Sequence, residues 1–177
     1  MSVLRVLDPG DAEVLSRLQR ENRAHLDPWS PVRDEYWRSV EGQLDLVERR
    51  LTEMAQGRTA VFVILDDTGD VVGEITLDGI VRGPFQNGHV GYWLAERATG
   101  RGLMTRAVEE LAAHAFDVMG LHRLQAGTLP HNTASQAVLR RCGFIPYGTA
   151  PRYLRIQGRW QDHVLFQRLA HEEPVDP

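Results

Sequence analysis

The chain has 177 residues, of which 42% are hydrophobic and 25% charged, and its formal net charge is −4. This length and composition are typical of one soluble globular domain with one core, so we expect a single domain over residues 1–170 and a polar tail over 171–177. The acidic balance disfavours a nucleic-acid binder, because such proteins are normally basic. The one cysteine, Cys142, has no partner for an intrachain disulfide, which fits a reducing compartment.

The sequence shows no membrane, export or metal signal. No apolar run reaches the roughly 18 residues of a membrane-spanning helix, and the first residues, MSVLRVLDPGD, lack the apolar stretch of a signal peptide. The seven histidines show none of the spacings typical of metal ligands. We therefore expect a cytoplasmic protein with no metal and no membrane partner.

Hydrophobic periodicity predicts one strand, two helices and a hairpin in the N-terminal half. The expected elements are a strand over 3–7, a helix between the turn at 8–11 and the proline-rich break at 27–31, a helix over 34–56, and strands over 59–66 and 71–80. The second helix is the clearer one, because its apolar residues recur every three or four positions: Tyr36, Val40, Leu44, Val47, Leu51 and Met54.

Strands and helices alternate in the C-terminal half. The expected elements are a strand over 89–94, a helix to about residue 119, a strand over 121–129, a helix over 132–142, and a hairpin over 144–156 and 159–169. Gly120 and Gly143 follow the helices as C-terminal caps, and Asn132 is a suitable N-cap. This order favours one α/β (α+β) domain on a largely antiparallel sheet with a parallel portion.

The segment Arg97-Ala98-Thr99-Gly100-Arg101-Gly102 follows a predicted strand and opens a predicted helix. Its glycines allow a ligand to approach the backbone closely, and the first amides of the helix have no intrahelical partner. Together with the helix dipole they suit a diphosphate. The segment matches neither the Walker A loop nor the dinucleotide fingerprint. A glycine-rich turn without a ligand is the alternative.

The spacing Arg97-x-x-Gly100-x-Gly102 resembles the Q/R-x-x-G-x-G/A signature of the GNAT superfamily of N-acetyltransferases. Three further stretches resemble its RimJ/RimL-type ribosomal-protein-alanine branch: GYWL at 91–94, LPHNTAS at 129–135 with LRRCGF at 139–144, and YLRIQGRWQDHVL at 153–165. The resemblance covers roughly residues 3–169. It implies the GNAT fold, with a mixed, mostly antiparallel sheet of about seven strands, about four helices, and splayed parallel strands four and five.

The resemblance further implies that acetyl-CoA lies between the splayed strands at 89–94 and 121–129. Its diphosphate would lie on the backbone amides of the glycine-rich segment. A backbone N–H near Trp93 would stabilise the oxyanion that forms when an amine attacks the thioester. The implied cofactor-binding residues are Trp93, Leu94, Arg97, Ala98, Thr99, Gly100, Arg101, Gly102, Leu103, Met104, Thr105, Asn132, Ser135, Arg140 and Arg141.

Ser135 is implied to lie near the thioester sulfur as a proton donor, and Asn132 to contact the cofactor. Their i, i+3 spacing puts both on one side of a helix's first turn, where helix capping is an equal explanation for them. Arg140 and Arg141 suit the 3′-phosphate of CoA, or simply the negative end of the helix dipole.

Glu74 on a central strand and His89 are the candidate general bases. His89 stands where relatives often carry a glutamate or another polar residue. A histidine has a suitable pKa for a base, although strand-end residues are commonly just exposed. Ordered water could also take the proton from the amine.

The leading hypothesis is acetylation of a protein N-terminus, such as the alanine of a ribosomal protein. The alternatives are acetylation of a small amine (an antibiotic, an amino acid or a polyamine) and a non-catalytic acyl-CoA-binding module, because one scaffold hosts many functions. A homodimer is expected only by analogy. Five aromatic residues are candidate walls of the acceptor pocket: Trp29, Tyr36, Trp37, Trp93 and Trp160.

Overall fold

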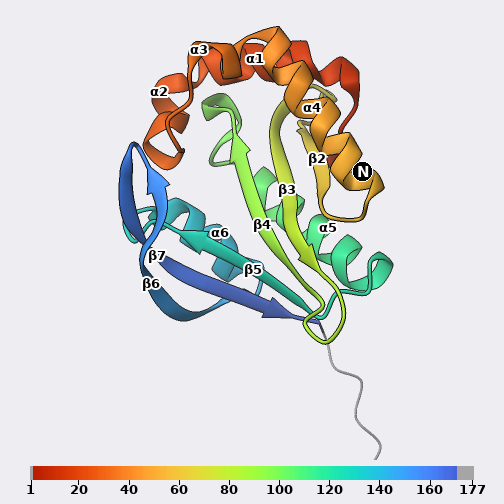
Figure 1. Ribbon diagram of the computed structural model, residues 1–177, viewed down its shortest axis with the longest axis vertical. Coiled ribbons are helices and arrows are strands. Elements are labelled where there is room, and N and C mark those ends of the chain that lie inside the picture. The colour runs from red at the N-terminus through yellow and green to blue at the C-terminus, as the bar shows by residue number, and fades with distance from the viewer. Residues whose placement is uncertain (1, 171–177) are drawn as a thin grey trace, which may run out of the picture.

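The structure is a computed structural model that describes residues 2–170. Within these residues, seven strands form one sheet in the order β1-β2-β3-β4-β5-β7-β6 (Figure 1). The strands are β1 Leu4–Val6, β2 Ala60–Leu65, β3 Val71–Val81, β4 Asn87–Leu94, β5 Arg123–Thr128, β6 Ile145–Ile156 and β7 Arg159–Leu169. Only β4 and β5 pair in parallel. The predicted fold class is therefore confirmed, whereas the predicted tail lies outside the described residues.

The described residues contain six α-helices and several shorter helical turns. The α-helices are α1 Ala12–Glu21, α2 Arg23–Leu26, α3 Glu35–Arg38, α4 Val40–Ala55, α5 Leu103–Ala113 and α6 Thr133–Arg141. The 3₁₀ turns are η1 Pro9–Asp11, η2 Asp27–Trp29 and η3 Glu96–Ala98, and α5 continues into a π-helical turn, η4 His114–Val118. None of the helices within residues 2–170 has the length and apolarity needed to cross a membrane.

The helix count differs from the prediction because two expected helices are each divided. The first divides at Asn22 into α1 and α2. The second, expected to be continuous over 34–56, divides at Ser39, which is extended with φ −71° and ψ 165° and whose hydroxyl accepts a 3.0 Å hydrogen bond from the Gly42 N–H. Apolar periodicity does not report a break of one residue, because the spacing of apolar residues continues across it. Tyr36, Val40 and Leu44, which carried that spacing, are exposed in the structure.

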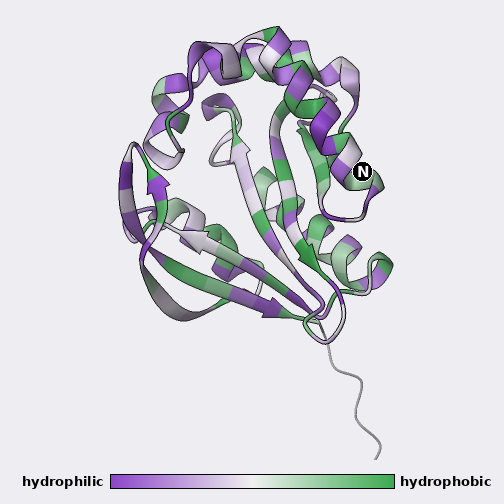
Figure 2. Ribbon diagram, in the orientation of Figure 1, coloured by the Kyte–Doolittle hydropathy of each residue, from purple (hydrophilic) through white to green (hydrophobic). Residues whose placement is uncertain are grey.

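Helices cover both faces of the sheet. The larger core lies on the face of α5 and α6, where Ile75, Leu111 and Phe166 are fully buried. A smaller core lies on the opposite face beneath α1 and α4, around Val47 and Val63. Figure 2 shows hydrophobic colour along β3 and on α5, which covers one face of the sheet. α1 to α4 cluster over one end of the sheet (Figure 1), which leaves the other end of that face without a helix.

We predict that Gly42→Ala lowers the free energy of unfolding. A Cβ at Gly42 would overlap the carbonyl group of Tyr36, where α3 meets α4. Alanine favours a helix interior by about 1 kcal/mol over glycine, but overpacking costs about 1–3 kcal/mol, so we expect a net loss. Denaturant unfolding measures it.

Gly148→Ala is the matched control, because a Cβ there meets nothing within 4 Å. We expect it to change stability by less than about 0.5 kcal/mol. Equal stability of the two variants would contradict the close approach of α3 to α4.

Candidate active site

A cavity opens where β4 and β5 separate. Residues 87–89 pair in parallel with residues 123–125, and beyond them the strands diverge (Figure 1). The resulting cavity of about 170 Å³, which we call the splay cavity, lies between residues 90–92 of β4 and 126–128 of β5. Its other lining residues are Trp29, Leu129, Asn132, Ser135, Leu139 and His163. The prediction of splayed parallel strands is therefore confirmed.

Two hydroxyl groups meet at the α6 side of the splay cavity. The phenol oxygen of Tyr92 lies 2.9 Å from Oγ of Ser135. Burial raises the pKa of Tyr92 to about 12, against the opposing effect of its hydrogen bond with Ser135. Tyr92 therefore stays protonated at neutral pH, and the pair can offer a hydrogen bond to an anion that forms in the cavity.

Asn132 begins α6 and lines the same cavity. Its Oδ1 accepts a 3.1 Å hydrogen bond from the Ser135 N–H, so it caps the helix as predicted. The capping bond leaves the amide NH₂ group of Asn132 available. Across the cavity on β5, the buried hydroxyl of Thr128 has no hydrogen-bond partner in the described residues. A polar ligand in the splay cavity would satisfy this hydroxyl.

His163 lies on the β7 side of the splay cavity and is 3% exposed. Its Nδ1 lies 3.0 Å from the carbonyl oxygen of Gln161, which can only accept, so Nδ1 carries the proton in the neutral ring. Nε2 then has the free lone pair. The ring lies beside Gly127, where a Cβ would stand 3.7 Å from His163 Cδ2. The glycine thus keeps the space between the histidine and β5 open.

The glycine-rich segment has the geometry expected of an anion site. Gly100 and Gly102 both have φ of +74°, and a Cβ at either would meet nothing within 4 Å. Gly102 is the N-cap of α5, and no side chain caps this helix. The first amides of α5, at Leu103, Met104 and Thr105, are therefore free of intrahelical partners. These amides and the helix dipole together favour a bound anion.

Arginines around this segment face an acidic turn between β2 and β3. Arg97 lies 3.6 Å from Asp66, and Arg101 lies 3.3 Å from Asp67. Both arginines are more than half exposed, so these ion pairs are weak. The side chains therefore remain free to turn towards a stronger anion.

The other predicted cofactor residues have mixed environments. Ala98 and Leu94 are buried in the larger core together with Leu103 and Met104, so only their backbone groups are available to a ligand. Thr99 donates its hydroxyl to the carbonyl of Glu96. Arg140 lies over the ring of Phe166 at 5.4 Å and Arg141 is exposed at the end of α6. Neither arginine lines the splay cavity.

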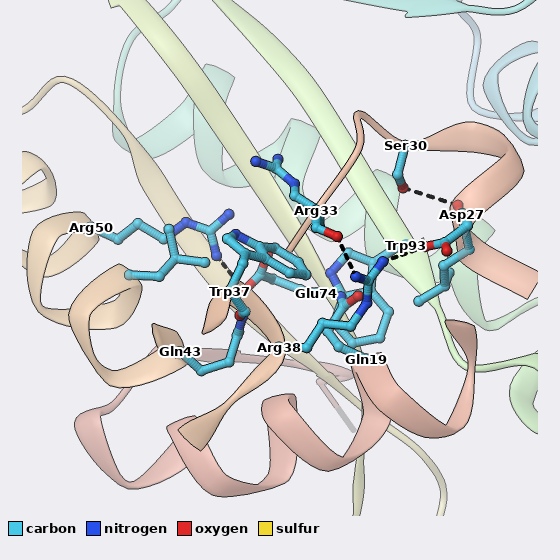
Figure 3. Close-up of a pocket in the computed structure, with 12 residues that line it drawn as sticks. Gln19, Asp27, Ser30, Arg33, Trp37, Arg38, Gln43, Arg50, Glu74 and Trp93 are labelled. Carbon is cyan, nitrogen blue, oxygen red and sulfur yellow. Dashed lines mark hydrogen bonds and ion pairs between the residues drawn. The ribbon is translucent and has the colours of Figure 1, made fainter. Parts of the chain in front are cut away.

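A second cavity of about 120 Å³ lies between α1, α4 and the η2–α3 segment (Figure 3). We call it the arginine cavity, because Arg33, Arg38 and Arg50 line it. Glu74 and Trp93 also line it. Glu74 is 4% exposed, and its carboxylate forms an ion pair with the Arg50 guanidinium at 2.6 Å. Glu74 therefore faces a cavity as predicted, but a different one from that of Ser135.

His89 lies at the last paired position before the strands separate and lines neither cavity. Burial lowers its pKa, while Asp78, opposite it on β3, acts in the other direction. The ring is therefore neutral at pH 7. The structure brings Ser135 and Asn132 together and leaves both predicted bases, Glu74 and His89, outside their cavity.

The predicted aromatic walls are divided between the two cavities. Trp29 lines the splay cavity and lies 5.5 Å from the His131 ring, whereas Trp37 and Trp93 line the arginine cavity. Tyr36 and Trp160 line neither cavity and are exposed.

Comparisons with known proteins decide the family. The model of the acetyltransferase (GNAT) domain matches residues 2–145. The chain belongs to the GNAT acetyltransferase family. It is 35% identical to the "Probable N-acetyltransferase YjcK" of Bacillus subtilis, over 94% of this chain and 92% of that protein. The ribosomal protein uS5-alanine N-acetyltransferase of Escherichia coli is 34% identical, over 92% of this chain and 84% of that protein.

Solved structures of acetyltransferases have the same fold as this chain. Mycobacterium smegmatis RimJ in complex with CoA-disulfide superposes with a TM-score of 0.92 at 34% identity, over 97% of this chain and 83% of that chain. The S5-alanine acetyltransferase of Vibrio fischeri gives a TM-score of 0.89 at 33% identity, over 94% and 91%. This protein is thus an N-acetyltransferase of the GNAT fold, and its RimJ/RimL-type resemblance is confirmed.

Two residues of the splay cavity had no predicted role: Tyr92 and His163. Both lie in stretches that carried the resemblance. Strand alternation puts Tyr92 on the face opposite to Trp93, and so towards α6. For His163 no local signal exists, because its inward direction depends on the pairing of β7 with β5.

Cys142 adds no thiolate nucleophile, and the described part of the chain offers no metal-binding cluster. Burial, with Glu109 close by, raises the pKa of Cys142 to about 12, so its thiol stays protonated. Residues 2–170 contain no cluster of three or more His, Cys, Asp or Glu side chains that could hold a metal ion. The absence of a metal stays a prediction.

We predict that Gly102→Val weakens the binding of CoA by at least tenfold, a change of about 1.4 kcal/mol. The new side chain would occupy the open space in front of the α5 amides. Isothermal titration with CoA measures the change.

Gly57→Val is the control. Gly57 has φ of +69° with nothing within 4 Å of a Cβ, so it carries the same backbone strain far from the loop. If both variants bind CoA equally, the loop is not the diphosphate site.

Proposed function

We propose that this acetyltransferase moves the acetyl group of acetyl-CoA to the α-amine of a protein N-terminus, as in the ribosomal-protein-alanine type, by direct attack and without a metal. The observation that carries the proposal is the splay cavity, in which a partly buried Tyr92–Ser135 pair and His163 lie on two sides of one gap. The relatives named for ribosomal protein alanine support the choice of acceptor. We propose that it acts in the cytoplasm, where ribosomal proteins are made.

The donor would extend from the α5 amides into the splay cavity. The free amides and the open space at Gly100 and Gly102 fit a diphosphate. The unpartnered hydroxyl of Thr128 fits the amide groups of a pantetheine chain between the strands. The thioester would then lie next to residues 91–93, where a backbone N–H stabilises the oxyanion.

A single histidine base suits an α-amine better than a lysine side chain. A free α-amine has a pKa of about 7.7–8.0, against about 10.4 for lysine. At pH 7 roughly a tenth of an α-amine is already neutral, whereas less than a thousandth of a lysine is. One histidine is therefore an adequate base for the first group. The remaining rate acceleration comes from holding the amine and the thioester in the geometry that the reaction needs.

We propose His163 as the group that takes the proton from the amine. Its ring lines the splay cavity, and because Nδ1 carries the proton, Nε2 has the free lone pair. Glu74 is engaged by Arg50 in the arginine cavity, and His89 lines neither cavity. On the other side, the Tyr92–Ser135 pair donates a hydrogen bond to the departing CoA thiolate.

We predict that the purified protein acetylates a peptide with N-terminal alanine at least tenfold faster, as kcat/KM, than spermidine, aminoglycosides or free amino acids. A tenfold preference corresponds to about 1.4 kcal/mol of transition-state binding. Mass spectrometry detects one added acetyl group at the peptide's α-amine.

A faster reaction with a small amine would replace the N-terminal assignment. CoA binding without thiol release on any amine would exclude an enzyme and leave an acyl-CoA-binding module.

We predict that His163→Gln lowers kcat by about 10²–10⁴-fold at pH 7, the range of general acid–base catalysis. We also expect the difference in kcat between the variant and the wild type to become smaller between pH 7 and pH 9. The narrowing follows because the amine loses its own proton in water over that range. Rates with the alanine peptide across this range measure it.

Glu74→Gln and His89→Gln serve as matched controls, and we expect their effects to be independent of pH. A pH-dependent deficit in Glu74→Gln or His89→Gln, with none in His163→Gln, would move the base to that residue.

A further inference from the structure

The arginine cavity has one more positive charge than its own carboxylates balance. Three arginines line it against two acids, Asp27 and Glu74. Arg38 is paired with Asp27 at 2.5 Å, and Arg50 with Glu74 at 2.6 Å. The remaining cation, Arg33, forms no ion pair within residues 2–170, and its guanidinium lies 4.7 Å from the centre of the Trp37 ring (Figure 3).

The acid nearest to Arg33 in sequence forms no ion pair with it. Asp34 uses its carboxylate to cap α3, accepting a 2.7 Å hydrogen bond from the Trp37 N–H. Arg33 is exposed as a whole residue, but partial burial of its guanidinium lowers its pKa, the charges of Arg50, Arg49 and Arg38 lower it further, and Asp34 acts in the other direction. An anion beside Arg33 would relieve this repulsion.

A second group in the cavity also lacks a partner. The Nε–H of Arg38 is buried and makes no hydrogen bond with the described residues, although the rest of this guanidinium bonds to Asp27 and to the Arg33 carbonyl. A buried donor without a partner costs about 1–3 kcal/mol. An oxygen acceptor that enters the cavity gains by satisfying this donor.

The arginine cavity and the splay cavity lie on opposite faces of β4, near the end of that strand. Trp93 lines the first and the preceding residue, Tyr92, which points to the other face, lines the second. The turn η2 likewise contributes Asp27 to the first and Trp29 to the second. A molecule whose amine reaches the splay cavity therefore has its next groups beside the arginine cavity.

We propose that the arginine cavity binds a carboxylate carried by the acceptor within a few residues of its amine, with Arg33 as the principal cation. The occupant is a carboxylate rather than a phosphate, because Asp27 and Glu74 share the cavity and would repel a dianion more strongly. The inference rests on the proposed function and makes it more specific. The preferred acceptor is an N-terminal alanine that is followed within a few residues by an acidic residue.

The test compares alanine peptides that carry Asp or Glu at positions 2, 3 or 4 with the same peptides carrying Asn or Gln. For the wild type we expect kcat/KM to be roughly tenfold higher for the best acidic peptide, the range of a charge-assisted hydrogen bond, mainly through KM. Arg33→Gln should abolish this preference and leave the neutral peptides within about twofold. Arg33→Lys should retain part of it.

Arg17→Gln, which removes an exposed arginine of α1 outside the cavity, should leave the preference intact. Equal rates on acidic and neutral peptides in the wild type would overturn the inference and leave the proposed function standing. An equal loss on both kinds of peptide in Arg33→Gln would also overturn it. Acetylation of none of the peptides would remove both proposals together.

Discussion

Only three residue pairs join β4 to β5 in parallel, and these pairs connect the two halves of the sheet. The site depends on this short pairing, because the two strands can then separate beyond it. β4 is fixed on its other side by β3, and β5 by β7 along its whole length. Each strand thus follows its own partner, and the two separate after His89. Backbone groups on the facing edges lose the partners that a continuous sheet would give them. A ligand that carries amide groups supplies those partners, so the gap selects for a chain such as pantetheine.

The two sides of the gap have different chemistry because they come from different parts of the fold. On the α6 side, burial keeps the Tyr92 phenol protonated, and the Asn132 cap fixes the first turn that holds Ser135. On the β7 side, the Gln161 carbonyl fixes the tautomer of His163. A hydroxyl pair that can donate a hydrogen bond and a ring nitrogen that can accept one thus line opposite sides of the cavity, and both are held by helix or strand residues.

The sequence predicted those features of the structure that depend on residues close together in the chain. The glycines at 100 and 102 were expected to adopt an anion-binding turn, and both have the positive φ that favours glycine. The succession of strands along the chain followed from short apolar runs and their turns, whereas their order in the sheet did not. Partners distant in the chain were not readable: Arg50 reaches Glu74 from α4 and draws that carboxylate into the arginine cavity. His163 depends on the register of β7, which the shift between Ala150 and Leu154 of β6 makes still less regular.

The acidic turn between β2 and β3 gives the glycine-rich segment a built-in counterion. Asp66 accepts hydrogen bonds from Thr68 and Asp70, which lower its pKa and keep it ionised. Its carboxylate, and that of Asp67, lie beside Arg97 and Arg101. The arginines are therefore not bare cations. If a diphosphate binds at this segment as proposed, it replaces two carboxylates, and the net electrostatic gain of binding is the difference between phosphate and carboxylate rather than the full attraction.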